Sequence, residues 1–380
     1  MLLACALAAL GWANLGGHDS YRDLFHGAIT IGFREALVRF TLLQLVNEGL
    51  MTIFFFLVGM EIKRELVEGE LRTLPQALLP AIGAVGGMAV PALVFLAFNH
   101  AGPGRAGWGI PMATDIAFCI GVLTILRTRV PHALVVFVTA LAIFDDIGGI
   151  LVIALFYGHG VDVAWLGGAG AMAMVVAAMS RARVRRGAAW TVAGALLWVA
   201  LHHAGIHATV SGVVLGLAIP ARGTPDERGE APLARFEDAL HPWVAFGVMP
   251  LFALANSGVH LAELDASQLS GRVAVGTAVA LFAGKQVGIF GFSLLALKLG
   301  VASLPRDTSV AKLLGASIVA GIGFTVALFI ATLAYSGDSG LLDEAKVGIL
   351  GGSLAAGLVG GAVLRLTPRV REPASGARGA

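Results

Sequence analysis

Residues 142–149 read Ala-Ile-Phe-Asp-Asp-Ile-Gly-Gly and place two adjacent carboxylates, Asp145 and Asp146, inside an apolar stretch long enough to cross a membrane. An aspartate at mid-bilayer costs roughly 2.5 to 3.5 kcal/mol on insertion scales, so a chain does not carry two by accident. Neighbouring residues of a helix point about 100° apart, so the two carboxylates cannot share one face. One can line a binding site while the other pairs elsewhere. The stretch therefore predicts a membrane segment built around an ion or proton site.

Two further charges lie inside apolar segments, Asp115 and Lys285. Lys285 is the only basic residue in the interior of a predicted span, which makes it the expected counter-ion of Asp145. The alternative is a structural ion pair that only joins two helices. That alternative leaves Asp115 and Asp146 unexplained, because one lysine neutralises one carboxylate.

The composition excludes a soluble domain. The chain has 380 residues, of which 57% are hydrophobic and 13% are charged, and its mean hydropathy is +0.84. Soluble domains are about 25% charged. The chain is therefore expected to be an integral membrane protein whose partner is the lipid bilayer, with no cofactor and no nucleic acid.

Apolar stretches of membrane-spanning length recur about twelve times and predict an all-α polytopic protein with short loops. Their approximate bounds are 1–15, 45–62, 77–99, 108–126, 132–157, 161–180, 188–203, 205–219, 242–259, 272–297, 313–335 and 345–364. No loop is long enough to fold alone, so residues 1–366 are expected to form a single transmembrane domain.

Three segments stand outside these spans. Residues 28–41 have two short β-favouring runs around Gly32, which predict a small β-hairpin, although a plain loop is the alternative. Residues 220–240 are polar and are expected to form a loop. Residues 367–380 are expected to be a disordered tail.

The distribution of basic residues predicts the orientation. When alternate loops are assigned to opposite sides, nineteen Lys and Arg residues fall on one side and six on the other. The six are Arg22, Arg34, Arg39, Arg105, Arg272 and Lys346. Because the richer side is normally cytoplasmic, both termini are expected in the cytoplasm.

Two spans carry breaks. Thr114 and Asp115 follow Pro111, and a proline within a membrane helix frees backbone carbonyls that need other partners. Gly321 and Gly323 interrupt a late span in the same manner. Paired interrupted spans indicate a transporter site near the midplane. A kinked helix with Asp115 near its end is the alternative.

Three histidines, His202, His203 and His207, have spacing that suggests a metal site, but no HExxH pattern accompanies them. We therefore do not expect zinc there. The sequence supplies no other motif for bound metal.

At these residues the chain resembles the NhaA family of sodium/proton antiporters. The matching motifs occur in family order and cover about residues 2–366. They are Asn47-Glu48-Gly49-Leu50-Met51, residues 56–66 (FLVGMEIKREL), residues 113–118 (ATDIAF), residues 142–148 (AIFDDIG), His207-Ala208-Thr209, His241-Pro242-Trp243-Val244, Gly284-Lys285 and residues 321–325 (GIGFT).

The resemblance implies twelve helices in inverted repeats, with two interrupted helices that cross near Thr114 and Gly323. It implies an ion site of Asp145 and Asp146, with Asp145 in a salt bridge to Lys285, and with Asp115 and Lys285 compensating the facing dipole ends. It further implies a homodimer formed through the 28–41 hairpin and pH regulation by a cytoplasmic cluster. The cluster comprises Glu61, Arg64, Glu65, Glu237 and His241.

The chain departs from the family pattern at Glu48, where many members have aspartate, and at Asp238, where a sensor-region histidine is common. Its first helix also begins about a dozen residues late, so the natural start is expected upstream.

The expected mechanism is competition between cations and protons for the same carboxylates. Desolvation raises the pKa of a buried carboxylate toward neutrality, so protons compete with Na⁺ and Li⁺ at Asp145 and Asp146. The Thr114 hydroxyl and broken-helix carbonyls add oxygen ligands. Two acids that exchange protons for one monovalent cation move net charge, so alternating access at this site would give electrogenic antiport rather than enzymatic catalysis. Two rival functions remain. A membrane prenyltransferase would need a second Asp-rich motif and basic ligands for pyrophosphate, and no other span of this chain supplies them. The other rival is a passive channel or a structural subunit.

Overall fold

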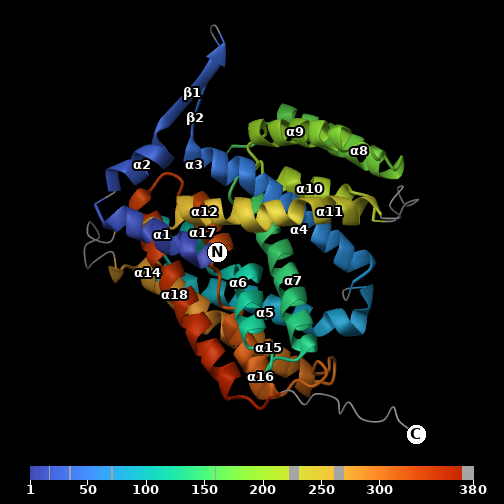
Figure 1. The fold of residues 1–380 in the computed structure, drawn as a ribbon, viewed down its shortest axis with the longest axis vertical. Helices are drawn as coiled ribbons and strands as arrows, with labels where there is room; N and C mark the ends of the chain where they lie inside the picture. Colours follow the sequence, from blue (N-terminus) through green and yellow to red (C-terminus); the bar gives the residue numbers. More distant parts are fainter. Residues whose placement is uncertain are drawn as a thin grey trace. The chain divides into compact units, whose positions relative to one another are not determined.

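The computed structural model describes residues 1–16, 18–33, 36–69, 72–158, 160–221, 231–260 and 269–369, and most of these are helical (Figure 1). The chain forms two compact units. Unit 1 contains Met1–Arg72, Asp146–Gly271 and Leu328–Lys346, and unit 2 contains Thr73–Asp145, Arg272–Ala327 and Val347–Ala380. One boundary between the units falls inside a helix, between Asp145 and Asp146.

Unit 1 starts with two helices and a β-hairpin, and it continues with a long helix that includes a π-helical stretch. Its elements are α1 (Leu2–Asn14), α2 (His18–His26), β1 (Ala28–Phe33), β2 (Ala36–Thr41), α3 (Leu42–Gln44), η1 (Leu45–Leu50), α4 (Met51–Val67), α8 (Val163–Arg181), α9 (Gly187–His203), α10 (Val210–Ala218), α11 (Pro232–Trp243), η4 (Val244–Val248) and α12 (Met249–Asn256).

Unit 2 holds the breaks of both interrupted helices. Its elements are α5 (Leu74–Phe98), η3 (Pro103–Met112), α6 (Ile116–Ile125), α14 (Arg272–Val279), η5 (Ala280–Gly284), α15 (Lys285–Lys298) and α16 (Val310–Val319). Three helices have residues in both units: α7 (His132–Phe156), α17 (Phe324–Ala334) and α18 (Ser339–Leu366).

The expected hairpin is confirmed. Strands β1 and β2 pair antiparallel, with Ala28 opposite Thr41 and Ile31 opposite Val38. Residues 34–35 at its tip lie outside the described residues.

The expected loop at 220–240 is wrong in part, because Pro232–Trp243 form helix α11. Leu233 and Glu237, one helical turn apart, are buried, and Phe236 and Leu240 pack against the core of unit 1. These four positions repeat with the 3.6-residue period of a helix. The polar composition of the segment led to the wrong prediction of a loop. Residues 222–230, and residues 370–380 of the expected tail, lie outside the described residues.

Helices of spanning length are fewer than the twelve expected segments. Among the described residues, seven helices are long and apolar enough to cross a bilayer, and two bent pairs bring the total to nine. Each expected segment does contain a helix. However, α1, α9 and α10 have only 13, 17 and 9 residues.

Glycines allow close helix contacts inside each unit. In unit 1, a Cβ atom on Gly212 or Gly216 of α10 would lie 2.3 or 2.4 Å from a carbonyl oxygen of α4. In unit 2, a Cβ on Gly288 of α15 would lie 2.1 Å from the carbonyl oxygen of Gly86 in α5. Only glycine permits these backbones to approach so closely, as small residues do in membrane helix pairs. Figure 1 also shows α8 and α9 of unit 1 side by side.

Candidate functional site

Asp145 is the centre of a buried polar network in unit 2. Its Oδ2 atom accepts a hydrogen bond from the Thr114 hydroxyl at 2.6 Å and from Lys285 Nζ at 2.7 Å. All three side chains are buried. The other carboxylate oxygen, Oδ1, has no hydrogen-bond partner among the described residues. A buried carboxylate with one free oxygen can take up a proton or a cation at that atom.

Thr114 lies in the break between η3 and α6, whose axes differ by 42°. Residues Ala113–Asp115 are not helical, and the backbone N–H of Asp115 donates to the carbonyl oxygen of Ile322 at 2.7 Å. Ile322 lies in the second break, where α16 and α17 differ by 44°. The Thr114 hydroxyl is also 3.0 Å from the carbonyl oxygen of Ala320. The two breaks therefore meet, as the sequence predicted for Thr114 and Gly323.

Gly323 lies at this meeting point. A Cβ there would be 3.2 Å from the carbonyl oxygen of Ala113, and one on Gly321 would be 2.6 Å from that of Leu281. The backbone of Leu281 thus leaves no room for a side chain at Gly321, and that of Ala113 leaves little room at Gly323.

Asp115 holds the N-termini of both broken helices. Its Oδ1 caps α6 by accepting the Phe118 N–H at 3.1 Å. Its Oδ2 accepts the Thr325 N–H, at the start of α17, at 3.0 Å, and also the Thr325 hydroxyl. One buried carboxylate thus faces the positive dipole ends of two helices.

Lys285 begins α15 directly after the π-helical stretch η5. Besides Asp145, it donates to the carbonyl oxygen of Met112, the last residue of η3. A cation at the carbonyl end of a broken helix complements its negative dipole end. The single ammonium group thus contacts both a carboxylate and a helix terminus.

Asp146 follows Asp145 on α7 and is 5% exposed. Adjacent helical side chains diverge by about 100°, so Asp146 points away from the direction of Asp145. The hydrogen bonds of Asp145 itself come from Thr114 and Lys285.

Part of the predicted pH-sensing cluster comes together in unit 1. Arg64 of α4 forms a salt bridge with Glu237 of α11 and lies 3.6 Å from Glu65. Glu61 lies one turn before Arg64 on α4, and His241 lies one turn after Glu237 on α11. Two helices that are far apart in the sequence are therefore joined at this cluster.

Glu48, one of the two positions at which the chain differs from the family pattern, lies in η1. Its carboxylate is 3.6 Å from His202 of α9. The His202 ring stacks on Trp198 with an interplanar angle of 4°. Beside Glu48, Asn47 exchanges two side-chain hydrogen bonds with Asn256 at the end of α12. Sequence reasoning assigned none of these partners.

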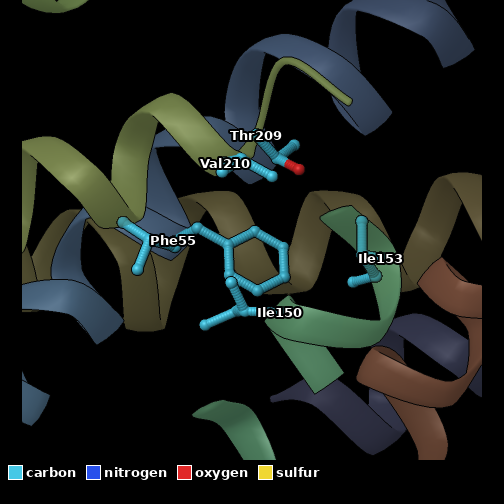
Figure 2. Close-up of a pocket in the computed structure, with 6 residues that line it drawn as sticks. Phe55, Ile150, Ile153, Thr209 and Val210 are labelled. Carbon is cyan, nitrogen blue, oxygen red and sulfur yellow. The ribbon is translucent and has the colours of Figure 1, made fainter. Parts of the chain in front are cut away.

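Two cavities in unit 1 are different in character. Figure 2 shows a gap with no room for a water molecule, lined by Phe55, Ile150, Ile153, Thr209, Val210 and Val213. Its one polar group, the Thr209 hydroxyl, lies 2.9 Å from His207 Nδ1, so this gap offers too few oxygen ligands for a cation. A polar cavity of about 650 Å³ lies between α2 and the start of α18.

Three partners in the unit 2 site were not predicted: Thr325, Ser353 and the carbonyl oxygen of Met112. Thr325 follows the glycine break and was quoted only as part of a motif. Ser353 lies in a long apolar helix, where one serine gives no signal. The sequence predicted freed carbonyls at the helix breaks, but side-chain patterns do not show which carbonyl meets which side chain.

The comparisons with known proteins agree with one another. The family model described as "Na+/H+ antiporter 1" matches residues 1–364. The chain is similar to the Na(+)/H(+) antiporter NhaA of Anaeromyxobacter sp. (strain Fw109-5), with 59% identity over 98% of this chain and 90% of the relative. It is also similar to Na(+)/H(+) antiporter NhaA 1 of Myxococcus xanthus, with 50% identity over 98% and 91%.

The fold resembles the sodium proton antiporter MjNhaP1 from Methanocaldococcus jannaschii, with a TM-score of 0.55 and 14% identity. The match covers 96% of this chain and 92% of the other. At this identity the similarity concerns the fold alone.

Proposed function

We propose that this chain, which belongs to the NhaA family of Na⁺/H⁺ antiporters, exchanges Na⁺ and also Li⁺ for protons by competition at Asp145 and Asp146. The chain is a multi-pass membrane protein of a sodium/proton antiporter family.

The observation that carries the proposal is the half-satisfied carboxylate of Asp145. Its Oδ2 has two donors, whereas Oδ1 has no hydrogen-bond partner in the described part of the chain. Burying an unpaired carboxylate oxygen is costly, and either a proton or a cation removes that cost. Because both bind the same oxygens, they exclude each other.

Hard monovalent cations prefer oxygen ligands, which favours Na⁺ and Li⁺ over softer ions. The carboxylates of Asp145 and Asp146, the Thr114 hydroxyl and the freed carbonyls of the breaks supply such oxygens. Asp115 and Lys285 do not bind the ion in this proposal. They neutralise the helix ends that the breaks create, so that the backbone at the site remains fixed.

Two protons exchanged for one cation transfer net charge, so the exchange is electrogenic. The membrane potential supplies about 2.3 kcal/mol per charge per 100 mV, which is enough to drive Na⁺ out of the cell. Alternating access would be provided by movement around the broken helices in an inverted-repeat architecture.

The charge distribution supports a location in the inner membrane with cytoplasmic termini. The Arg64, Glu65 and Glu237 cluster, with Glu61 and His241 nearby, is the proposed pH regulator. The β1–β2 hairpin has unpaired strand edges, on which a second copy could pair to form the homodimer.

The test is sodium-triggered proton release from everted membrane vesicles, followed with a pH-sensitive dye from neutral to alkaline pH. The compared proteins are wild type, Asp145→Asn, Asp146→Asn and, as the matched control, Asp307→Asn. Asp307 is exposed and has φ of 55°, a conformation that asparagine also tolerates. We expect release in wild type and in the control, and its loss in both site variants.

Equal signals from Asp146→Asn and wild type would remove Asp146 from the mechanism. Sodium entry with no proton response would exclude antiport and leave the channel function. A dissipated membrane potential (K⁺ with valinomycin) should slow the exchange, and an unchanged rate would exclude electrogenic exchange.

A further inference from the structure

Ser353 is a buried serine on α18 that lies at the second helix break of unit 2. Its hydroxyl oxygen accepts the backbone N–H of Gly323 at 3.3 Å and of Phe324 at 3.2 Å. α17 begins at Phe324. The two N–H groups therefore belong to the set at a helix start that has no partner within the helix.

The sequence around this break explains why a distant serine is needed. A helix start is usually capped by a Ser, Thr, Asp or Asn side chain of the same segment. The first broken helix, α6, has such a cap in Asp115. Residues 320–323 read Ala-Gly-Ile-Gly and offer none. α17 therefore receives its caps from other helices: Ser353 for the first two N–H groups and Asp115 for that of Thr325.

The break that Ser353 holds is the one that contacts the ion site. The carbonyl oxygen of Ala320 lies 3.0 Å from the Thr114 hydroxyl, and that of Ile322 accepts the N–H of Asp115 at 2.7 Å. Gly323 directly follows Ile322. A rotation of the peptide groups at the start of α17 would thus alter the position of both carbonyls.

We propose that Ser353 is a positioning residue of the ion site, which fixes the start of α17 so that the carbonyls of Ala320 and Ile322 stay directed at Thr114 and Asp115. It does not contact the ion. This inference rests on the proposed function, because its effect on transport requires that Thr114 and Asp145 form the site.

The experiment compares four variants in everted vesicles: Ser353→Ala, Ser353→Thr, Ser293→Ala and Ser317→Ala. Ser293 and Ser317 are the matched controls, because both are buried serines of unit 2 that cap no break. The Ser293 hydroxyl has no hydrogen-bond partner in the described residues, and that of Ser317 bonds to Leu313 of its own helix. The readouts are the KM for Na⁺, the maximal rate, the pH profile and the thermal midpoint in detergent.

We expect Ser353→Ala to raise the KM for Na⁺ about tenfold and to shift the pH profile, since two buried N–H groups lose their acceptor. Its thermal midpoint should fall further than those of the controls, because the N–H groups of Gly323 and Phe324 are left buried without an acceptor. Ser353→Thr keeps the hydroxyl and should restore the KM to within about twofold. A wild-type KM in Ser353→Ala, or an equal KM change in the controls, would overturn the proposal.

Hydrogen exchange at residues 323–325 adds a readout that needs no transport. Ser353→Ala should speed exchange at Gly323 and Phe324, while Thr325 remains protected by Asp115. An equal change in the exchange rates of all three amides, or no change, would also overturn the proposal.

If Ser353→Ala does not accumulate, Ser353→Cys replaces it, because a thiol is a weak acceptor of similar size. Absence of antiport in wild type and in Ser293→Ala would instead refute the proposed function, and the exchange data would still decide the positioning role.

Discussion

The Thr114 hydroxyl has one proton and two acceptors within reach, Asp145 Oδ2 at 2.6 Å and the Ala320 carbonyl oxygen at 3.0 Å. When Asp145 is ionised, the shorter distance favours donation to the carboxylate. When Asp145 carries a proton on Oδ1, its Oδ2 becomes a weaker acceptor, and the Thr114 hydroxyl can donate to the Ala320 carbonyl oxygen instead. One hydroxyl can therefore serve both protonation states of the site and link them to the second helix break.

Thr114→Val and Thr114→Ser test this role. The valine variant removes the hydroxyl at nearly constant volume, and loss of a hydrogen bond to a charged group costs about 1.5 to 3 kcal/mol. We expect its KM for Na⁺ in everted vesicles to rise at least tenfold, whereas the serine variant should remain close to wild type. If valine matches wild type, Thr114 does not take part in ion binding.

Lys285 and Asp145 are fully buried partners, and each is costly to leave alone. Asp145→Asn or Lys285→Met alone should destabilise the protein by about 3 to 5 kcal/mol, because a charge remains buried without its partner. The double variant Asp145→Asn/Lys285→Met should recover most of that stability while antiport stays absent. The measurement is the denaturation midpoint in detergent, with Asp307→Asn as the control. Additive losses in the double variant would contradict the pairing.

At the scale of elements, the α2 helix is joined to the end of α12 by Tyr21. The Tyr21 hydroxyl contacts the carbonyl oxygens of Leu254 and Ala255 and accepts the N–H of Gly258. Burial raises the pKa of this phenol well above its ordinary value, so the group stays protonated at any physiological pH. A neutral phenol thus caps the C-terminus of α12 and holds α2 in place.

His26, at the end of α2, makes this contact sensitive to pH. Partial burial lowers the pKa of His26, and the charge of Lys346 lowers it further. A backbone hydrogen bond with Arg22 and the carboxylate of Asp343 act in the opposite direction. Asp23, Tyr21 and His260 also line the cavity that it faces. A lowered pKa means that the docked helix favours neutral histidine. The docked state is therefore most stable above the ordinary histidine pKa of about 6.5 and loses stability as the pH falls from there toward the lowered pKa.

Hydrogen exchange of residues 18–26 measures this effect. We expect faster exchange at pH about 5 than at pH about 8, after correction for the intrinsic rates, because protonation of His26 begins near its ordinary pKa. His26→Gln should remove most of the difference, since glutamine has no charge to gain. Persistence of the difference in that variant would assign the pH effect to another group.

At the scale of the whole molecule, the parts predictable from sequence are those with a side-chain signal. Charges in apolar segments indicated Asp145 and Lys285, and the expected contact between them is present. The glycine break indicated Gly323, and alternating β-favouring residues indicated the hairpin. The rest of the network depends on carbonyls and on Ser353, which are brought to the site by tertiary contacts. α11 was missed because the apolar residues of its helical period, Leu233, Phe236 and Leu240, lie in a segment whose polar composition suggests a loop.

The number of membrane crossings depends on the two bent pairs, and the first of them, η3 with α6, can be tested against the arginine-rich segment after α8. Length and composition allow this pair to be either one broken span or a re-entrant loop. As a span, three crossings separate Ala101 from Ala182: the bent pair, α7 and α8. The two residues then lie on opposite sides. As a re-entrant loop, the pair leaves two crossings and places both residues on one side.

Single cysteines at these positions, in a chain with Cys5 and Cys119 replaced by alanine, distinguish the two cases. The segment 181–186 holds four arginines, so we expect Ala182→Cys to face the cytoplasm. A membrane-impermeant maleimide should label it in everted vesicles only, and should label Ala101→Cys in intact cells only. Retained antiport is the control for correct insertion of each variant. Labelling of both positions from the same side would make the pair a re-entrant loop. It would then reverse the assignment of every loop before η3, because the positive-inside argument depends on their strict alternation.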